Sequence, residues 1–181
     1  LFVSIYEWYN MSKKKEHKIL GIIFLILSFY SAYYFRNELY GNYIYFIMII
    51  SICVFTDIGG YIFGNFFKGP KLTKISPKKT QSGMMGSYIL AIVASTIFIQ
   101  YYTSEVSIDK NIVTIDLKFF FFFLLISSVS QGGDLIISVF KGLSKIKNTG
   151  QIIPGHGGLL DRIDGMIFVF PFVYILIIIL Q

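Results

Sequence analysis

Five apolar runs separated by short polar segments limit what this chain can fold into more than any other feature of it. A helix rises about 1.5 Å per residue, so about 20 apolar residues cross the roughly 30 Å of hydrocarbon in a bilayer. With 55% hydrophobic and only 14% charged residues, the chain cannot give these runs a soluble surface. The pattern predicts an all-α polytopic integral membrane protein, whose full spans are residues 19–35, 43–63, 84–102, 119–140 and 164–180.

Residues 1–11 are apolar but too few to cross a bilayer. We therefore expect a truncated N-terminal helix there, and we expect that the chain lacks part of its N-terminus. Residues 1–181 are predicted to form a single membrane-embedded domain of about five full transmembrane helices and this partial one. Cys53 lies inside an apolar run, and because it is the sole cysteine it predicts a packing role rather than a disulfide.

The basic residues predict the orientation of these spans. If successive polar segments alternate between the two sides of the membrane, 13 lysine and arginine residues fall on one side and 3 on the other. Cytoplasmic loops are enriched in these residues, so the richer side is expected to be cytoplasmic. It holds residues 12–18, 65–83 and 141–164. The basic residues that give the net charge of +6 are distributed as membrane topology requires, so this charge argues against nucleic acid as a partner.

The stretch 130–164 begins inside one apolar run and ends at the start of another, yet it carries Asp134, His156, Asp161, Arg162 and Asp164. Such residues are costly at the edge of hydrocarbon and usually face a cavity in which they act. On a helix, Asp134, Ser138 and Lys141 share one face, which predicts a polar cavity that opens to the cytoplasm. The alternative is an aspartate that only forms hydrogen bonds with a neighbouring helix.

The segment PGHGGLLDRID, residues 154–164, combines glycines with acidic and basic residues. Glycines around His156 suit a backbone that wraps around an anionic group and presents N–H groups to it. Asp161 and Asp164 share a face if a helix has begun, and paired carboxylates bind hard cations such as Mg²⁺. The alternative is a helix start at which the acids interact with the helix dipole.

Two features upstream have functional and structural interpretations that the residues leave open. The lysine-rich loop 68–83 either covers a phosphate-rich ligand or only marks the cytoplasmic side and contacts anionic lipids. Asp57 lies near the cytoplasmic end of its span, at a depth similar to that of Asp134, which predicts a common polar cavity.

These residues together resemble the phosphatidate cytidylyltransferases, also called CDP-diacylglycerol synthases. Gly133-Asp134-Leu135 looks like the GDL element of that family, residues 57–64 resemble its D-x-G-A-Y segment, and residues 75–83 resemble its SPKKT-x-x-G loop. The resemblance extends more weakly to Glu7-Trp8. Its signature spacing is matched by Ser138, Lys141, Lys147, Gly150, Pro154, His156, Gly157, Gly158, Asp161, Arg162 and Asp164.

The chain departs from the family pattern at several positions. Ile137 stands where the family usually has an acid, Gly142 where it has arginine, and Asn148 where it has aspartate. Gln81-Ser82 replaces an expected Trp-Glu pair.

The resemblance implies an enzyme that transfers the cytidylyl group of CTP to phosphatidate, with CDP-diacylglycerol and diphosphate as products. It implies Mg²⁺, with or without a second, monovalent cation, on Asp134, Asp161 and Asp164. It implies Asp134, Asp161, Lys141 and His156 as catalytic residues, with His156 in phosphate contact or loop structure rather than in proton abstraction. Substrate contacts are implied for Asp57, Ser76, Lys78, Lys79, Thr80, Ser138, Lys147, Gly157, Gly158 and Arg162.

The implied partners are CTP, phosphatidate and the lipid bilayer, in a bacterial-type inner membrane with the active site on its cytoplasmic face. Whether the chain acts as a monomer or a homodimer stays open. Two other functions stay open too. One is a catalytically degenerate homologue with a lipid-binding or scaffold role. The other is an ion or proton pathway through Asp57 and Asp134, although such a pathway would not require the 154–164 segment.

Overall fold

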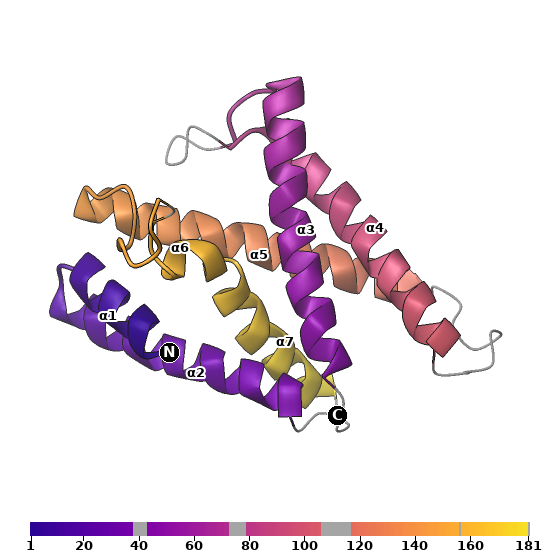
Figure 1. Ribbon diagram of the computed structural model, residues 1–181, viewed down its shortest axis with the longest axis horizontal. Helices are drawn as coiled ribbons and strands as arrows, with labels where there is room; N and C mark the ends of the chain where they lie inside the picture. Colours follow the sequence, from indigo (N-terminus) through magenta and orange to yellow (C-terminus); the bar gives the residue numbers. More distant parts are fainter. Residues whose placement is uncertain (38–42, 73–78, 106–116, 156, 181) are drawn as a thin grey trace. The chain divides into compact units, whose positions relative to one another are not determined.

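The structure is a computed structural model, and it describes residues 1–37, 43–72, 79–105, 117–155 and 157–180. Within these ranges all regular secondary structure is helical apart from two isolated β-bridges (Figure 1). The helices are α1 (Phe2–Met11), α2 (Lys15–Asn37), α3 (Ile44–Phe67), α4 (Gln81–Glu105), α5 (Leu117–Ser144), α6 (Leu160–Ile163) and α7 (Met166–Leu180).

Four of these helices, α2 to α5, are long and apolar enough to cross a membrane. The prediction of an all-α polytopic membrane protein is confirmed, and the chain is an integral membrane protein. Helix α7 is apolar along its whole length but has only 15 residues, about 22 Å at 1.5 Å per residue. It begins two residues after the start of the span expected at residues 164–180, because Asp164 and Gly165 form the turn between α6 and α7.

The chain divides into two compact units, which are described separately. Unit one comprises Leu1–Tyr45 and Gly132–Gln181, and unit two comprises Phe46–Gln131. Helix α5 passes from unit two into unit one at Gly132.

Unit one is built on contacts of α2 with α1 and α7 (Figure 1). Its hydrophobic core consists of Trp8, Met11, Leu25, Ile137, Leu160 and Ile167. The indole ring of Trp8 occupies the space that a side chain at Gly21 would need, and its Nε1 donates a hydrogen bond to the carbonyl oxygen of His17 at 2.9 Å. The Ser28 hydroxyl, which is 2% exposed, donates to the Ile167 carbonyl at 2.6 Å and so joins α2 to α7.

Unit two joins α3, α4 and the first half of α5 through small polar residues. The Ser87 hydroxyl donates to the Thr56 carbonyl oxygen at 2.7 Å, and the Thr56 hydroxyl donates to Ser127 Oγ at 3.0 Å. Gly59 packs against the backbone of Gly86. Small residues that let helix backbones approach are typical of helix packing in membranes. Cys53 is buried as a free thiol, in agreement with its predicted packing role.

Candidate active site

The C-terminal half of α5 carries the first part of the candidate site. The Ser138 hydroxyl donates to Asp134 Oδ1 across one helical turn, at 3.4 Å. Lys141 lies one turn further along the same helix face. The face predicted for these three residues is therefore present in unit one.

An ion pair connects α5 to α6. Lys141 Nζ lies 2.9 Å from Asp161 Oδ1, and the two side chains are only 17% and 12% exposed. At this low exposure water screens the pair weakly, so it holds the two helices together more strongly than a surface salt bridge would. The structure thus brings together two residues that the sequence predicted to be catalytic and that are 20 positions apart.

The second carboxylate oxygen of Asp161 organises the loop between α5 and α6. It accepts hydrogen bonds from the N–H of Thr149 at 2.8 Å and from the N–H of Gly158 at 3.0 Å. Partial burial raises the pKa of Asp161, but the bonds from Lys141 and from these two N–H groups outweigh it. The pKa therefore lies below the ordinary value, and Asp161 is a carboxylate at neutral pH.

The glycine-rich turn leads into α6. The Ile153 N–H donates to the Gly157 carbonyl at 3.0 Å, so the chain reverses between them. Gly155 and Gly157 have φ angles of 74° and 88°, a region in which residues with a side chain are strained. The predicted tight wrapping of this segment is therefore present, but the N–H of Gly158 is directed at Asp161.

Helix α5 ends in a left-handed turn that directs the chain into this loop. Lys145 has a φ of 57°, and the N–H of Ile146 donates to the carbonyl of Lys141 at 3.0 Å. This geometry satisfies the last carbonyls of the helix. The Ser144 hydroxyl donates to the Met11 carbonyl, so the end of α5 is also attached to the end of α1.

Glu7 on α1 is a site residue to which the sequence reasoning gave no role. Its side chain is 1% exposed, and it accepts hydrogen bonds from the N–H groups of Leu159 and Leu160 at 2.9 and 2.8 Å. It also accepts one from the hydroxyl of Thr149 at 3.1 Å. The signal in the sequence was a charged residue inside an apolar helix. Its partners are more than 140 positions away, so no local pattern could identify them.

Asp134 and Asp164 come from neighbouring backbone segments. A side chain at Gly133 would approach the carbonyl oxygen of Asp164 to 3.0 Å, so α5 passes close to the turn between α6 and α7. Asp164 is 9% exposed, and its Oδ1 accepts a bond from the N–H of Gly165. These carboxylates have the oxygen chemistry that Mg²⁺ prefers. Among the described residues, however, no group of three or more His, Cys, Asp or Glu could hold a metal ion by itself.

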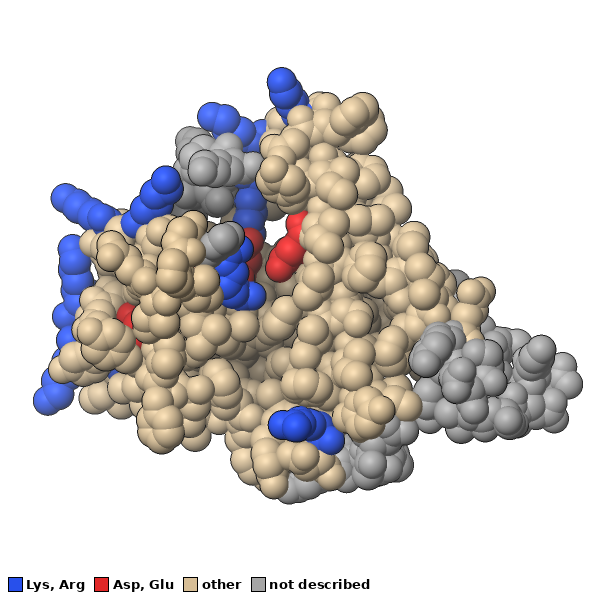
Figure 2. All heavy atoms as spheres, viewed as in Figure 1, with Lys and Arg blue, Asp and Glu red and all other residues tan. Residues whose placement is uncertain are grey.

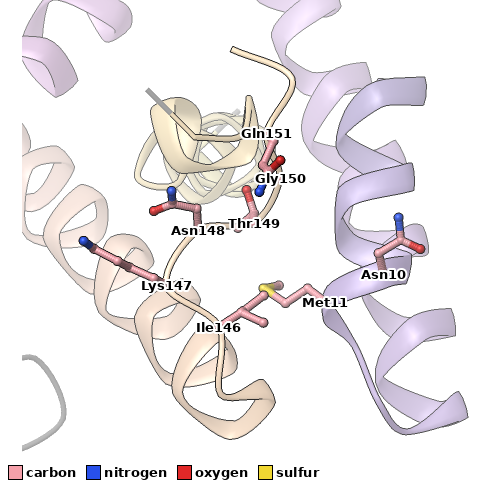
Figure 3. Close-up of a pocket in the computed structure, with 8 residues that line it drawn as sticks. All are labelled: Asn10, Met11, Ile146, Lys147, Asn148, Thr149, Gly150 and Gln151. Carbon is pink, nitrogen blue, oxygen red and sulfur yellow. The ribbon is translucent and has the colours of Figure 1, made fainter. Parts of the chain in front are cut away.

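A pocket of about 440 Å³ opens between the end of α1 and the loop after α5 (Figure 3). Met11 and Ile146 give it an apolar part, and the amides of Asn10, Asn148 and Gln151 give it polar groups. Its remaining lining residues are Lys147, Thr149 and Gly150. The pocket therefore adjoins the same backbone that Asp161 and Glu7 hold.

The family follows from comparison with known proteins. Residues 1–180 match the cytidylyltransferase family. The chain belongs to this family. A phosphatidate cytidylyltransferase of Rickettsia typhi is 36% identical over 174 residues, which are 91% of this chain and 72% of that protein.

Two further relatives carry the same name. The phosphatidate cytidylyltransferase of Bacillus subtilis is 33% identical over 87% of this chain and 56% of its own length. That of Haemophilus influenzae is 39% identical over 64% of this chain and 39% of its own length. The resemblance inferred from the sequence motifs is thereby confirmed.

Three departures from the family motif lie in unit one and have distinct environments. Ile137 is fully buried in the hydrophobic core, where an acid would be desolvated. At Gly142 no atom lies within 4 Å of an added Cβ, so this position has room for a longer side chain. A Cβ added at Gly157 would lie 3.2 Å from the side chain of Asn148, so this side chain lies directly against the glycine-rich turn.

Other predicted substrate-binding residues belong to unit two. Asp57 lies on α3 and is exposed, and Lys79 and Thr80 precede α4. The Thr80 hydroxyl accepts a bond from the N–H of Gly83 at 3.1 Å, which is the geometry of an N-cap. Thr80 therefore has a structural role at the start of α4, and its substrate contact stays a prediction.

Three of the predicted site residues, Ser76, Lys78 and His156, lie outside the described residues. Arg162 on α6 and Lys147 in the loop after α5 are exposed on unit one. In Figure 2, lysine and arginine side chains gather over the end of this unit where α1 turns into α2 and α5 ends. The exposed lysines of these segments are Lys13, Lys14, Lys15, Lys145 and Lys147.

Proposed function

We propose that this protein catalyses cytidylyl transfer from CTP to phosphatidate and so forms CDP-diacylglycerol and diphosphate. The observation that carries the proposal is the family match over residues 1–180. It is supported by an ordered polar site in unit one, where Lys141 and Asp161 join α5 to the glycine-rich turn. Relatives that carry this activity in their names align with 87–91% of the chain in two cases.

The reaction joins two polyanions. An anionic oxygen of the phosphatidate phosphate attacks the α-phosphorus of CTP, and a new P–O bond forms. The bond from that phosphorus to the oxygen bridging to the β-phosphate breaks, and diphosphate leaves with the electron pair. Because the attacking oxygen is already ionised, the step needs no protein base. Catalysis then depends on position and on charge stabilisation.

In our proposal, different residues of unit one bind the phosphates and fix the turn. The exposed cations Lys147 and Arg162 would attract the phosphates of CTP, and Arg162 can form two parallel bonds to one phosphate. Lys141 has a carboxylate partner 2.9 Å away, so it contributes less net charge and fixes the turn. We add the predicted phosphate contacts of Ser138 and Gly157; the N–H of Gly158 donates to Asp161 Oδ2, and the contacts of the lysine-rich loop of unit two stay predictions.

We assign Mg²⁺ to Asp134 and Asp164, with substrate phosphate oxygens and water as the remaining ligands. When bound, the ion would neutralise the phosphates and align them. Asp161 stays a predicted third ligand, and its oxygens also accept bonds from Lys141, Thr149 and Gly158. In our proposal it therefore holds the loop as well.

The proposal also places the active site on the cytoplasmic face of the inner membrane. The support is the distribution of basic residues, 13 on the predicted cytoplasmic side against 3 on the other. CTP is made in the cytoplasm, so this orientation gives the site its water-soluble substrate.

A direct assay tests the proposal. The purified full chain in phosphatidate-containing vesicles should form CDP-diacylglycerol only when CTP and a divalent cation are both present. Asp134→Asn should abolish product formation, whereas Glu16→Gln, the same acid-to-amide change at an exposed residue of α2, should not. Absence of product from the unmodified chain would reject the enzyme in favour of a degenerate homologue. Ion flux across vesicles without CTP, lost in Asp57→Asn, would favour a pathway.

A further inference from the structure

Glu7 is buried in a way that packing alone does not explain. It is 1% exposed on a ten-residue helix whose other buried residues are Ser4, Trp8 and Met11. A buried carboxylate costs free energy unless hydrogen bonds replace its lost hydration, so a residue that only filled space would be apolar. The three hydrogen bonds to Glu7 supply that replacement, and all of them come from the loop after α5 and the first residue of α6.

These bonds join two separate parts of the loop. Thr149 belongs to the first part, and Leu159 and Leu160 belong to the second. Asp161 joins the same two parts through the N–H groups of Thr149 and Gly158. Thr149, which is 5% exposed, therefore gives its N–H to one carboxylate and its hydroxyl to the other.

Two glycines in the loop make room for this carboxylate. A Cβ at Gly150 would lie 2.6 Å from Glu7 Oε1, and a Cβ at Gly158 would lie 2.6 Å from Glu7 Oε2. Neither distance allows a side chain at these positions without displacing Glu7. The spacing of these glycines therefore suits the approach of Glu7 from α1, a role distinct from close approach of a substrate.

We propose that Glu7 is a positioning residue, which fixes Thr149–Gly150 against Gly158–Leu160 and so sets the shape of the loop that binds CTP. At 1% exposure its carboxylate is covered by the loop and does not touch substrate. It acts through the residues that it holds, which are flanked by Lys147 and Arg162. Two of them, Thr149 and Gly150, line the pocket in Figure 3. This inference rests on the proposed function, because it takes CTP as the ligand of this loop.

The decisive variant is Glu7→Gln, with Glu16→Gln as its matched control. A glutamine keeps one acceptor oxygen, so its NH₂ group must face at least one of the loop's N–H or hydroxyl donors. Because each bond to a charged acceptor contributes more than a neutral one, the KM for CTP should rise by about tenfold or more. The KM for phosphatidate should stay within about twofold of the unmodified value if only the nucleotide loop is disturbed.

A second pair keeps the test decisive if Glu7→Gln does not fold. Thr149→Val removes one bond to Glu7, and Thr149→Ser retains it. The valine variant should raise the KM for CTP, and the serine variant should stay close to the unmodified protein. Equal values for the two variants, or a parallel rise in both substrate KM values together with a lower melting temperature, would overturn the inference in favour of general stabilisation.

Hydrogen exchange separates this inference from the proposed function. The peptide that covers residues 149–160 should exchange faster in Glu7→Gln than in the unmodified chain, and Glu16→Gln should leave it unchanged. If the unmodified chain makes no CDP-diacylglycerol, the proposed function fails, and with it CTP as the ligand. If the chain is active but the exchange and the KM for CTP are unchanged in Glu7→Gln, the positioning role fails alone.

Discussion

Replacing Asp161 by asparagine should weaken unit one by about 2 kcal/mol, since a hydrogen bond to a charged group contributes about 1.5–3 kcal/mol. The carbonyl oxygen of asparagine can take the place of Oδ2 and keep the bonds from Thr149 and Gly158. Its NH₂ group then faces Lys141 Nζ, which loses a partner at 2.9 Å. For a chain of this size, the melting temperature should fall by about 4–8 °C.

A double-mutant cycle measures the pair itself. Lys141→Met, Asp161→Asn and the double variant should show a coupling energy of about 1–2 kcal/mol in detergent-solubilised thermal or denaturant unfolding. A control cycle uses Lys145→Met in place of Lys141→Met, because Lys145 is exposed after the end of α5. The coupling energy between Lys145→Met and Asp161→Asn should be less than about 0.5 kcal/mol. Coupling this weak at Lys141 would refute the ion pair as the link between α5 and α6.

The pH dependence of stability gives the same pair a second test. The pKa of Asp161 in the folded chain lies below its ordinary value of 3.8. A depressed carboxyl pKa stabilises the folded state above the unfolded pKa, and this contribution is lost as pH falls through the folded pKa. The stability difference between the unmodified chain and Asp161→Asn should therefore be constant at neutral pH and should shrink below about pH 4. A difference that persists unchanged at pH 2 would contradict the assignment.

Three further changes have definite expectations. In thermal melts, Gly157→Ala should destabilise the chain by about 1–2 kcal/mol, because alanine is strained at φ 88°. Gly142→Ala should be neutral or slightly stabilising, because the space around this position is open. Ile137→Asp, which restores an acid to the family motif, should cost about 3 kcal/mol or more in unfolding free energy, because that position is 0% exposed in the core. Chelation of divalent cations should stop CDP-diacylglycerol formation and added Mg²⁺ should restore it, whereas undiminished product with chelator would exclude the metal.

Local patterns in the sequence were enough to predict the membrane fold and one face of the site. The apolar runs predict five full spans, and four of them correspond to described helices that are long and apolar enough to cross a membrane. A spacing of four places Ser138 next to Asp134. The first depends on the length of each apolar run, and the second on periodicity within one helix. Helix α7 begins at Met166, two residues after the expected start of the last span, because the sequence alone does not reveal the turn at Asp164 and Gly165.

The organisation of the glycine-rich turn could not be predicted in this way. The sequence suggested that its N–H groups would be presented to an anionic group but did not show which one; those of Gly158, Leu159 and Leu160 donate to the carboxylates of Asp161 and Glu7. The Glu7 contact spans 153 positions, so it is set by tertiary packing rather than by any motif. Thr149 donates its N–H to Asp161 and its hydroxyl to Glu7. For the same reason, no local sequence pattern predicted these contacts.

Doubly labelled CTP tests the central claim most directly. With one label on the α-phosphate and a different label on the β-phosphate, the full chain in phosphatidate vesicles should move the α label into the lipid fraction. The β label should appear as diphosphate in equal amount. An α label that stays in the aqueous phase, or a β label that enters the lipid, would contradict cytidylyl transfer by this protein.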